Sequence, residues 1–414
     1  MSSHPARVLV LVTALHFATH MYSTFLNPLN TELKEFFGLE LDQSVTFFQT
    51  LYLVVYAAGN LIAGALCTRF PARALLALGP FVNGLAVAGM SCLSPGQYAG
   101  MCALVALGAL GGGLYHPVAN VLLTETFLEH RGRALGISGF GASLSFVVAP
   151  WSAYALVRYA GWSWQHVTLV YGAAGAACGA LTYFVVPDDR RSAAERSALS
   201  DPAAAASPSL RAVLLFAGLG VLTVAGREMA GWGVPVITRQ YSDVAFGEAT
   251  GAWYVNAGFL LAMMSLPGVL AQPLAGRWSD KLGRERVMGV SLAVVAAAVF
   301  ALPRLGPEYV VFAYVVAGGF ISASVPAFEA LLADRTPLRY RGLVFGFAIT
   351  AAIGSGALGP VVAGAAADAG GRTPAAYANA FTLLACLVAV SAVMAWTLKP
   401  AARRLGLMGK PRLG

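Results

Sequence analysis

Twelve apolar runs follow one another along the chain, each bounded by charged or turn-forming residues. Most of them reach the roughly 20 residues that an α-helix needs to cross the hydrocarbon core of a membrane. Six runs precede a long polar stretch, at residues 8–29, 45–67, 74–93, 98–124, 134–157 and 167–186. Six more follow it, at residues 212–234, 250–274, 287–302, 309–332, 343–367 and 377–398. The pattern predicts an all-α membrane protein with twelve transmembrane helices in two six-helix bundles.

The polar stretch between the two groups of runs contains three prolines, an alanine and serine run and several charges. This composition is typical of a flexible linker. We therefore expect an N-terminal bundle at residues 1–186, a cytoplasmic linker at 187–211, a C-terminal bundle at 212–398 and a basic cytoplasmic tail at 399–414. The first run follows Arg7 directly, but it is longer than the core of a signal peptide, so it is counted as a span.

Composition and charge support this organisation. Hydrophobic residues make up 58% of the 414 positions and charged residues 11%, against about 25% charged residues in an ordinary soluble domain. A soluble globular enzyme is excluded, and the net charge of +8 does not indicate a nucleic-acid-binding module. Of the 27 lysines and arginines, 21 fall on the side that holds both termini, 5 fall on the other side, and Arg227 lies within a span. Because positive residues stay in cytoplasmic loops, both termini are expected to be cytoplasmic.

The two halves of the chain carry an internal repeat. His130-Arg131-Gly132 precedes Ala149-Pro150 by the same distance at which Tyr340-Arg341-Gly342 precedes Gly359-Pro360, with an offset of 210 residues between the halves. Parallel halves joined by a cytoplasmic linker are typical of secondary transporters whose substrate site lies near the middle of the membrane.

One loop carries the resemblance to a known family. Residues 276–286 read GRWSDKLGRER, and this loop resembles the G-x-L-x-D-R-x-G-R-R motif of the major facilitator superfamily. Gly276, Asp280, Gly283 and Arg284 match the motif, and Arg286 follows it directly. The equivalent loop of the first half departs from the motif, with Thr68 for the aspartate and Pro71 for the glycine. Within that superfamily, residues 114–119 (LYHPVA) resemble the His-Pro signature of fosmidomycin-resistance-like exporters.

The resemblance implies the fold and the kind of function. It implies a proton-coupled secondary active transporter of a bacterial inner membrane that works by alternating access, without a cofactor and as a monomer. The expected partners are a small-molecule substrate, protons and the lipid bilayer. Efflux of a small amphipathic or anionic compound is the first interpretation, and proton-coupled uptake of an organic anion is the alternative. A membrane-embedded enzyme is a remote alternative, because no nucleophile with its base and no paired-carboxylate metal motif is found in the sequence.

Few ionisable residues lie within the predicted spans, where each is costly unless it faces a cavity or a partner. They are His16, His20, His116, Arg227, Glu228 and Glu329. They fall on the first, fourth, seventh and tenth helices, and the resemblance implies that these four helices line the central cavity. The residues expected to bind substrate are His16, His20, His116, Arg227, Tyr115 and Trp232.

Each of these residues has a structural interpretation beside the functional one. His16 and His20 share one helical face, where they bind a proton or an anion, or else only pack against neighbouring helices. A zinc site needs a third ligand nearby, for which His116 is the obvious candidate, and we expect no metal. Arg227 suits a carboxylate or phosphonate, or else forms a permanent ion pair with a glutamate.

Glu228 and Glu329 are the candidates for proton coupling. Glu228 follows Arg227 directly and is expected to point about 100° away from it around the helix, free to titrate. Glu329 lies near the cytoplasmic end of its helix and is expected to carry a proton or to form a gate pair. In the loop motif, Asp280, Arg284 and Arg286 are expected to clamp the two halves through a partly solvated ion pair, worth about 1 kcal/mol or less to stability.

Overall fold

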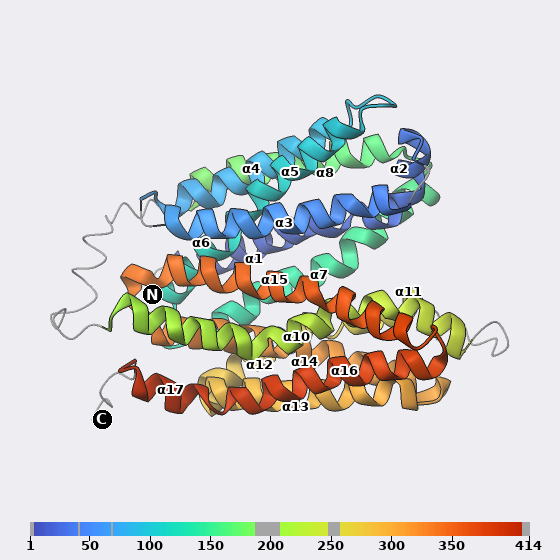
Figure 1. Ribbon diagram of the computed structural model, residues 1–414. Coiled ribbons are helices and arrows are strands. Elements are labelled where there is room, and N and C mark those ends of the chain that lie inside the picture. Colours follow the sequence, from blue (N-terminus) through green and yellow to red (C-terminus); the bar gives the residue numbers. More distant parts are fainter. Residues whose placement is uncertain (1–3, 40–41, 68, 187–207, 247–256, 408–414) are drawn as a thin grey trace. The chain divides into compact units, whose positions relative to one another are not determined.

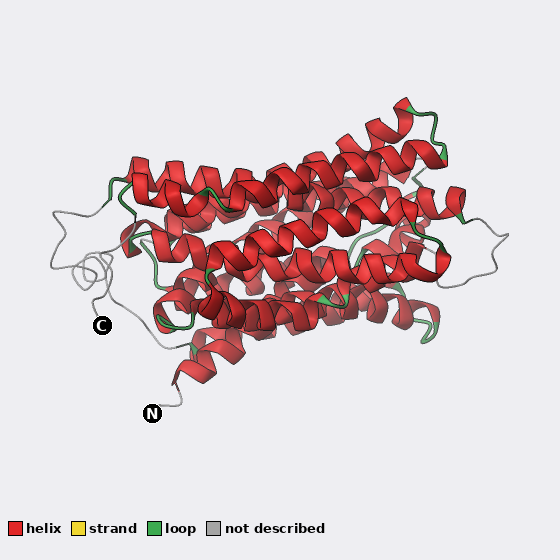
Figure 2. Cartoon of the chain, turned by 90° about the horizontal axis from the view of Figure 1, so that it is seen from below, coloured by secondary structure: helices red, strands yellow, loops and turns green. Residues whose placement is uncertain are grey.

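The computed structural model describes residues 4–39, 42–67, 69–186, 208–246 and 257–407. In these ranges the regular structure is helical (Figure 2). The first half contains α1 (His4–Thr24), η1 (Asn27–Leu29), α2 (Asn30–Phe37), α3 (Asp42–Leu66), α4 (Ala72–Met90), α5 (Tyr98–Gly113), α6 (Tyr115–Thr126), α7 (Arg131–Arg158) and α8 (Trp164–Val185). The second half contains α10 (Leu210–Ala245), α11 (Ala257–Ser265), α12 (Gly268–Leu282), α13 (Arg284–Ala301), η5 (Leu302–Arg304), α14 (Pro307–Arg335), α15 (Leu338–Ala369), α16 (Pro374–Ala395) and α17 (Leu398–Arg404).

The predicted all-α membrane fold is confirmed. Among the described residues, eleven helical segments are long and apolar enough to cross a membrane. The predicted first span corresponds to α1, whose 21 residues include three histidines that lower its hydropathy. Most of the predicted linker, at residues 187–207, lies outside the described residues, as do residues 250–256 of the predicted eighth span and residues 408–414 of the basic tail.

Two predicted spans are each built from two helices. One runs through α5 and α6, which meet at Leu114, and the other runs through α11 and α12, which meet at residues 266–267. In contrast, α10 is continuous: its apolar span, predicted to end at residue 234, ends at Thr238, and the helix continues beyond the span. The helix passes through Pro235 and ends at Ala245, because a proline within a membrane helix is tolerated where neighbouring groups satisfy the carbonyl that it leaves free.

The chain forms two compact units that are not continuous in sequence. Unit 1 comprises residues 1–126, 141–202 and 338–350, and unit 2 comprises residues 127–140, 203–337 and 351–414. In unit 1, α4 packs against α8 and α5, and α3 packs against α5 (Figure 1). In unit 2, α13 packs against α14 and α16, and α10 also packs against α16.

Glycines bring two pairs of helices into backbone contact, one pair in each unit. In unit 1, a Cβ atom added to Gly64 of α3 would lie 2.6 Å from the carbonyl oxygen of Gly342, at the start of α15. In unit 2, a Cβ atom added to Gly276 of α12 would clash with the carbonyl oxygen of Gly132, at the start of α7. Gly132 and Gly342 are 210 residues apart, which is the offset of the internal repeat. The repeated glycine therefore makes the same kind of helix contact in both units.

Candidate functional site

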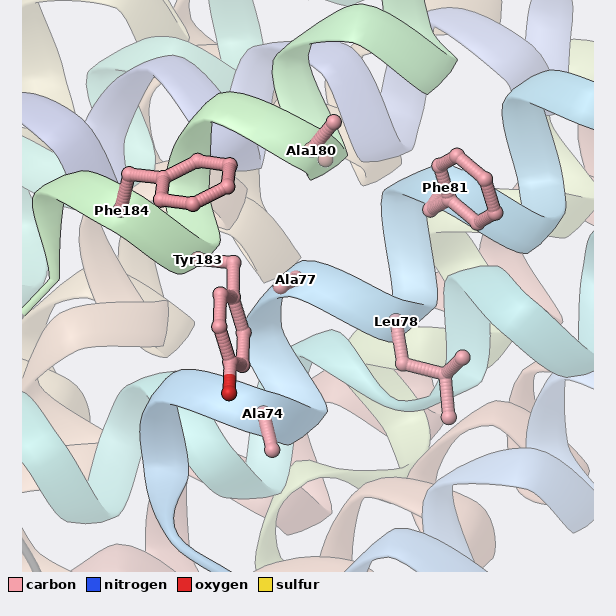
Figure 3. Close-up of a pocket in the computed structure, with 8 residues that line it drawn as sticks. Ala74, Ala77, Leu78, Phe81, Ala180, Tyr183 and Phe184 are labelled. Carbon is pink, nitrogen blue, oxygen red and sulfur yellow. The ribbon is translucent and has the colours of Figure 1, made fainter. Parts of the chain in front are cut away.

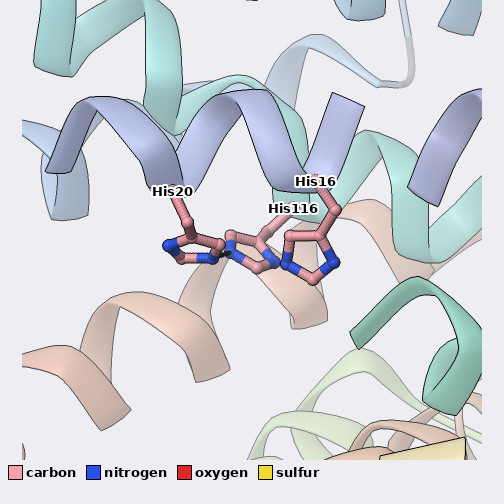
Figure 4. Close-up of side chains that lie close together, drawn as sticks. All are labelled: His16, His20 and His116. Atoms are coloured by element: carbon pink, nitrogen blue, oxygen red, sulfur yellow. Dashed lines mark hydrogen bonds between the residues drawn. The ribbon is translucent and has the colours of Figure 1, made fainter. Parts of the chain in front are cut away.

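Three histidines lie together in unit 1 (Figure 4). His16 and His20 are one turn apart on α1, and their ring centroids are 5.0 Å apart. His116 lies in the first turn of α6, with its ring centroid 4.8 Å from that of His16 and 5.2 Å from that of His20. The Nε2 atoms of His20 and His116 are 3.1 Å apart and share a hydrogen bond. One ring nitrogen of each histidine lies within 4.8 Å of the other two.

The break between α5 and α6 positions His116. Leu114 separates the two helices, and Pro117 follows in the first turn of α6, where a missing backbone N–H breaks no helical hydrogen bond. Tyr115 is 1% exposed and donates its hydroxyl to the carbonyl oxygen of Val12 at 2.8 Å. This bond ties α6 to α1, so Tyr115, predicted to bind substrate, holds the two helices that carry the histidines.

Aromatic rings surround the three histidines. The ring centroid of Phe146 is 5.0 Å from that of His20, and the ring of Tyr56 lies 6.4 Å from His20 and 6.1 Å from His116. The Tyr115 ring lies 4.8 Å from His16. His16 is buried, and His20 and His116 are each partly accessible. The cluster therefore offers polar ring nitrogens within largely apolar surroundings.

The second group of predicted residues lies in unit 2, on α10. Arg227 is 4% exposed, and one of its terminal nitrogens donates to the Ser324 hydroxyl of α14 at 3.1 Å. The other terminal nitrogen forms an ion pair with Glu228. The prediction that Glu228 points away from Arg227 was wrong. Both side chains are long enough to bend toward each other, and a membrane interior strongly favours pairing of two charges over leaving each alone.

Trp232 and Glu329 occupy different surroundings. Trp232 lies one turn after Glu228 on α10, and an added Cβ atom on Gly356 of α15 would lie 2.9 Å from its indole nitrogen and 3.5 Å from the Glu228 Cβ atom. Trp232 therefore packs beside the ion pair in unit 2. Glu329 is half-buried on α14, five residues after Ser324. Sequence reasoning missed Ser324, whose available signal was a hydroxyl beside Pro326 on the tenth predicted span.

The loop motif forms a network at the start of α7 in unit 2. The two carboxylate oxygens of Asp280 accept the backbone N–H groups of Gly132 and Arg133, at 2.9 and 2.8 Å. Asp280 also forms an ion pair with Arg284. Gly283, which separates α12 from α13, has a φ of +97°, a conformation that L side chains rarely adopt.

Further ion pairs extend this network to α14. Asp334 pairs with Arg131 at 2.7 Å and with Arg284 at 3.0 Å, and Arg335 pairs with Glu285 at 3.3 Å. Arg286, predicted to belong to the clamp, is exposed and lies outside the ion pairs found among the described residues. The Arg284 and Asp280 side chains are 12% and 8% exposed, so the pair is only partly accessible to solvent, in line with the expectation of a partly solvated pair.

An apolar pocket of about 410 Å³ lies between α4 and α8 (Figure 3). It is lined by Ala74, Ala77, Leu78, Phe81, Gly179, Ala180, Tyr183 and Phe184. Phe184 is 82% exposed and Leu78 48%. Exposed apolar side chains on a membrane helix face lipid. This pocket is therefore a shallow groove on the lipid-facing surface of unit 1.

Comparisons with known proteins give a consistent family. A model described as the Major Facilitator Superfamily matches residues 12–255 and 216–409. Multidrug resistance protein 2 of Bacillus subtilis is 32% identical over 138 residues, which are 32% of this chain and 34% of that protein. Tetracycline resistance protein, class D, of Salmonella ordonez is 33% identical over 158 residues, which are 36% and 38% of the two chains. The matched segments thus span little more than a third of these relatives.

Solved structures share the fold over nearly the whole chain. The proton:xylose symporter XylE bound to 6-bromo-6-deoxy-D-glucose has a TM-score of 0.77 at 15% identity and covers 96% of both chains. The human organic anion transporter MFSD10 has a TM-score of 0.68 at 15% identity, with 95% of this chain and 100% of that one covered. At such identities the likeness is one of fold alone.

Proposed function

Since the chain belongs to the major facilitator superfamily of transporters, we propose that it is a proton-coupled secondary active transporter that exports a small amphipathic compound by alternating access. Membership of this family also favours a transporter over the membrane enzyme considered as a remote alternative. The proposed location is a bacterial inner membrane with both termini in the cytoplasm. The likeness of residues 114–119 to fosmidomycin-resistance-like exporters stays a prediction.

The names of the relatives support export. Multidrug, tetracycline and quinolone resistance proteins are among the curated proteins that match parts of this chain. A membrane transporter confers resistance to a drug by moving the drug out of the cell. The matched segments are limited, so export by this chain rests on the analogy with these relatives.

The observation that carries proton coupling is the Arg227–Glu228 ion pair. Its two side chains are 4% and 20% exposed, within the span formed by α10. A carboxylate in such a place is stable as an ion only while it keeps its partner. Protonation of Glu228 neutralises it and releases one arm of the Arg227 guanidinium, and loss of the proton restores the pair.

The charge of the substrate decides whether this ion pair moves it against the protons or together with them. A cationic amphipathic compound competes with the proton for Glu228, so compound and proton move in opposite directions, which is export driven by proton entry. An anionic compound binds Arg227 only when Glu228 is neutral, so the anion and the proton move together. The same ion pair therefore supports uptake of an organic anion as the second candidate function, and it does not drive export of an anion.

The test uses purified protein in proteoliposomes with an imposed pH gradient and three probes: a lipophilic cation, a carboxylate and a phosphonate. We expect uphill movement of the cation against the proton flow. Glu228→Gln should abolish this accumulation and retain downhill flux, whereas Glu129→Gln, at an exposed position, should behave like the wild type. Proton-driven movement of the carboxylate or phosphonate along with the protons would instead establish anion uptake. Uphill cation transport that persists in Glu228→Gln would reject Glu228 as the proton carrier.

A further inference from the structure

The three histidines of unit 1 form an arrangement that the proposed transport cycle does not use. They come from two helices, and His20 and His116 are 96 residues apart in sequence. We propose that His16, His20 and His116 form a binding site for one divalent transition-metal ion of the class that prefers imidazole, such as Zn²⁺, Co²⁺ or Ni²⁺, with an anionic group as the fourth ligand.

The distances suit a metal ion. Zinc binds imidazole nitrogens at about 2.0–2.1 Å, so two nitrogens of a tetrahedral site are about 3.3 Å apart. The Nε2 atoms of His20 and His116 are already 3.1 Å apart. The remaining separations are at most 4.8 Å, and rotation of the His16 ring about its side-chain bonds shortens them. Three imidazoles with one open position make up a donor set that zinc uses in proteins.

The hydrogen bond between His20 and His116 does not satisfy the whole cluster. It uses one nitrogen of each ring, and the Nδ1 atom of His116 is buried without a hydrogen-bond partner. An ion bound at the Nε2 atom of His116 keeps the ring proton on this Nδ1, where a water molecule or another acceptor is expected beside it. A proton joins only two of the three imidazole rings at a time. A divalent ion accepts a nitrogen lone pair from each of the three rings.

The surroundings of the histidines call for an anionic fourth ligand. Neutral imidazoles leave both charges of a divalent ion uncompensated, which is costly in an apolar environment. Among the described residues of unit 1, the acidic residues are Glu32 and Glu35 on α2, Asp42 at the start of α3 and Glu125 on α6. Asp42 lies fourteen residues before Tyr56, about 21 Å along the helix at 1.5 Å per residue. Glu125 lies nine residues after His116, about 13 Å along the helix at 1.5 Å per residue. The proposed fourth ligand is therefore an external anion, either hydroxide or a small carboxylate or phosphonate.

The first experiment measures metal binding to the purified protein. The protein is purified through an affinity tag that contains no histidines. Co²⁺ is titrated into the detergent-solubilised protein while its visible absorption is recorded, and the Zn²⁺ stoichiometry is measured by equilibrium dialysis. We expect one ion per chain and the intense visible absorption of tetrahedral Co²⁺. His20→Gln and His116→Gln should each weaken binding by more than about 100-fold, since loss of a direct ligand exceeds the 10- to 100-fold effect of a supporting residue.

The matched control is His166→Gln. His166 begins α8 in the same unit, and its ring Nδ1 is 3.0 Å from the Ser163 hydroxyl, away from the cluster. This variant should bind metal like the wild type. Metal-free thermal stability and elution volume show whether each variant is folded, and His16→Gln replaces any variant that is not. Absence of saturable binding by the wild type, or equal binding by the folded cluster variants, would overturn the metal site.

The second experiment tests the fourth ligand. Addition of methylphosphonate or benzoate to the Co²⁺-loaded protein should change the visible spectrum of the wild type and of His166→Gln. An unchanged spectrum would overturn the open anionic position. Neither experiment involves transport, so a negative result would leave the proposed proton-coupled export as it stands, and a failure of that proposal would not affect the metal site.

Discussion

Arg227 and Glu228 show how two charged residues satisfy each other within a predicted membrane span. Consecutive residues point about 100° apart around a helix, and an i,i+1 pair does not face in one direction. The structure nevertheless joins them, and Ser324 takes the other arm of the guanidinium. The arginine therefore uses its fork to hold two partners on two helices, a geometry that a single ammonium group does not reproduce.

Arg227→Lys tests this role of the fork. The substitution keeps the positive charge and removes one of the two donor directions. If a transported anion takes the place of Glu228 on Arg227, the apparent KM for that anion should rise about tenfold or more, because a lysine does not hold Ser324 and the anion together in the geometry of the guanidinium, and a tenfold change corresponds to about 1.4 kcal/mol. The measurement is initial flux in proteoliposomes over a range of anion concentrations.

The control for Arg227→Lys is Arg372→Lys. Arg372 pairs with Asp368 at 2.7 Å, and the two side chains are 70% and 58% exposed. Transport by this variant should equal that of the wild type. An unchanged KM for the anion in Arg227→Lys, at normal expression, would assign Arg227 to helix packing alone.

At the level of helices, Asp280 completes the start of α7. The first backbone N–H groups of a helix have no partner within the helix, and the partial positive charge there favours a carboxylate. Asp280 reaches the N–H groups of Gly132 and Arg133 from the end of α12. Gly132 and Gly276 make this possible, because backbone contact between α7 and α12 leaves no room for a Cβ atom on either residue.

Asp280→Asn removes the charge from this junction and keeps its shape. We expect slower transport and a loss of about 1 to 2 kcal/mol of stability, since the carboxylate both caps a helix and pairs with a covered arginine. Flux at saturating substrate and the thermal unfolding midpoint in detergent measure the two effects. Asp368→Asn, in the exposed pair with Arg372, should change neither. Wild-type flux in Asp280→Asn would show that the network does not control the transport cycle.

At the level of the whole molecule, the two compact units each include the first turns of a helix from the other half of the sequence. Residues 127–140 belong to unit 2 and residues 338–350 to unit 1. The two copies of the repeated segment therefore occupy equivalent positions in the helix packing of the two units. The orientation of the molecule in a membrane follows instead from the distribution of lysine and arginine, 21 of which are predicted on the cytoplasmic side.

Single cysteines test the orientation in a variant whose five natural cysteines are replaced by alanine. Tyr159→Cys lies between α7 and α8 at a position that is 77% exposed, and Arg403→Cys lies at an exposed position of α17. An impermeant maleimide should label Tyr159→Cys on intact cells and Arg403→Cys only after the membrane is opened. Labelling of Arg403→Cys on intact cells would place the C-terminal end outside and reverse the predicted topology.

The sequence by itself determined the order of the spans and the class of fold. These follow from local properties, because roughly 20 apolar residues form a membrane helix wherever they occur. The sequence also carries the repeat of Arg131-Gly132 in Arg341-Gly342, which indicated two related halves, and the motif from Gly276 to Arg286, which indicated the family.

Only the tertiary structure decided which of the candidate residues meet. His116 lies beside His16 and His20 because the break at Leu114 and the bond from Tyr115 to Val12 turn its ring toward α1. Glu228 turns to Arg227 because both side chains lie where water is scarce and a lone charge is costly. Such contacts depend on helix packing and side-chain rotation, and spacing along the chain does not encode either.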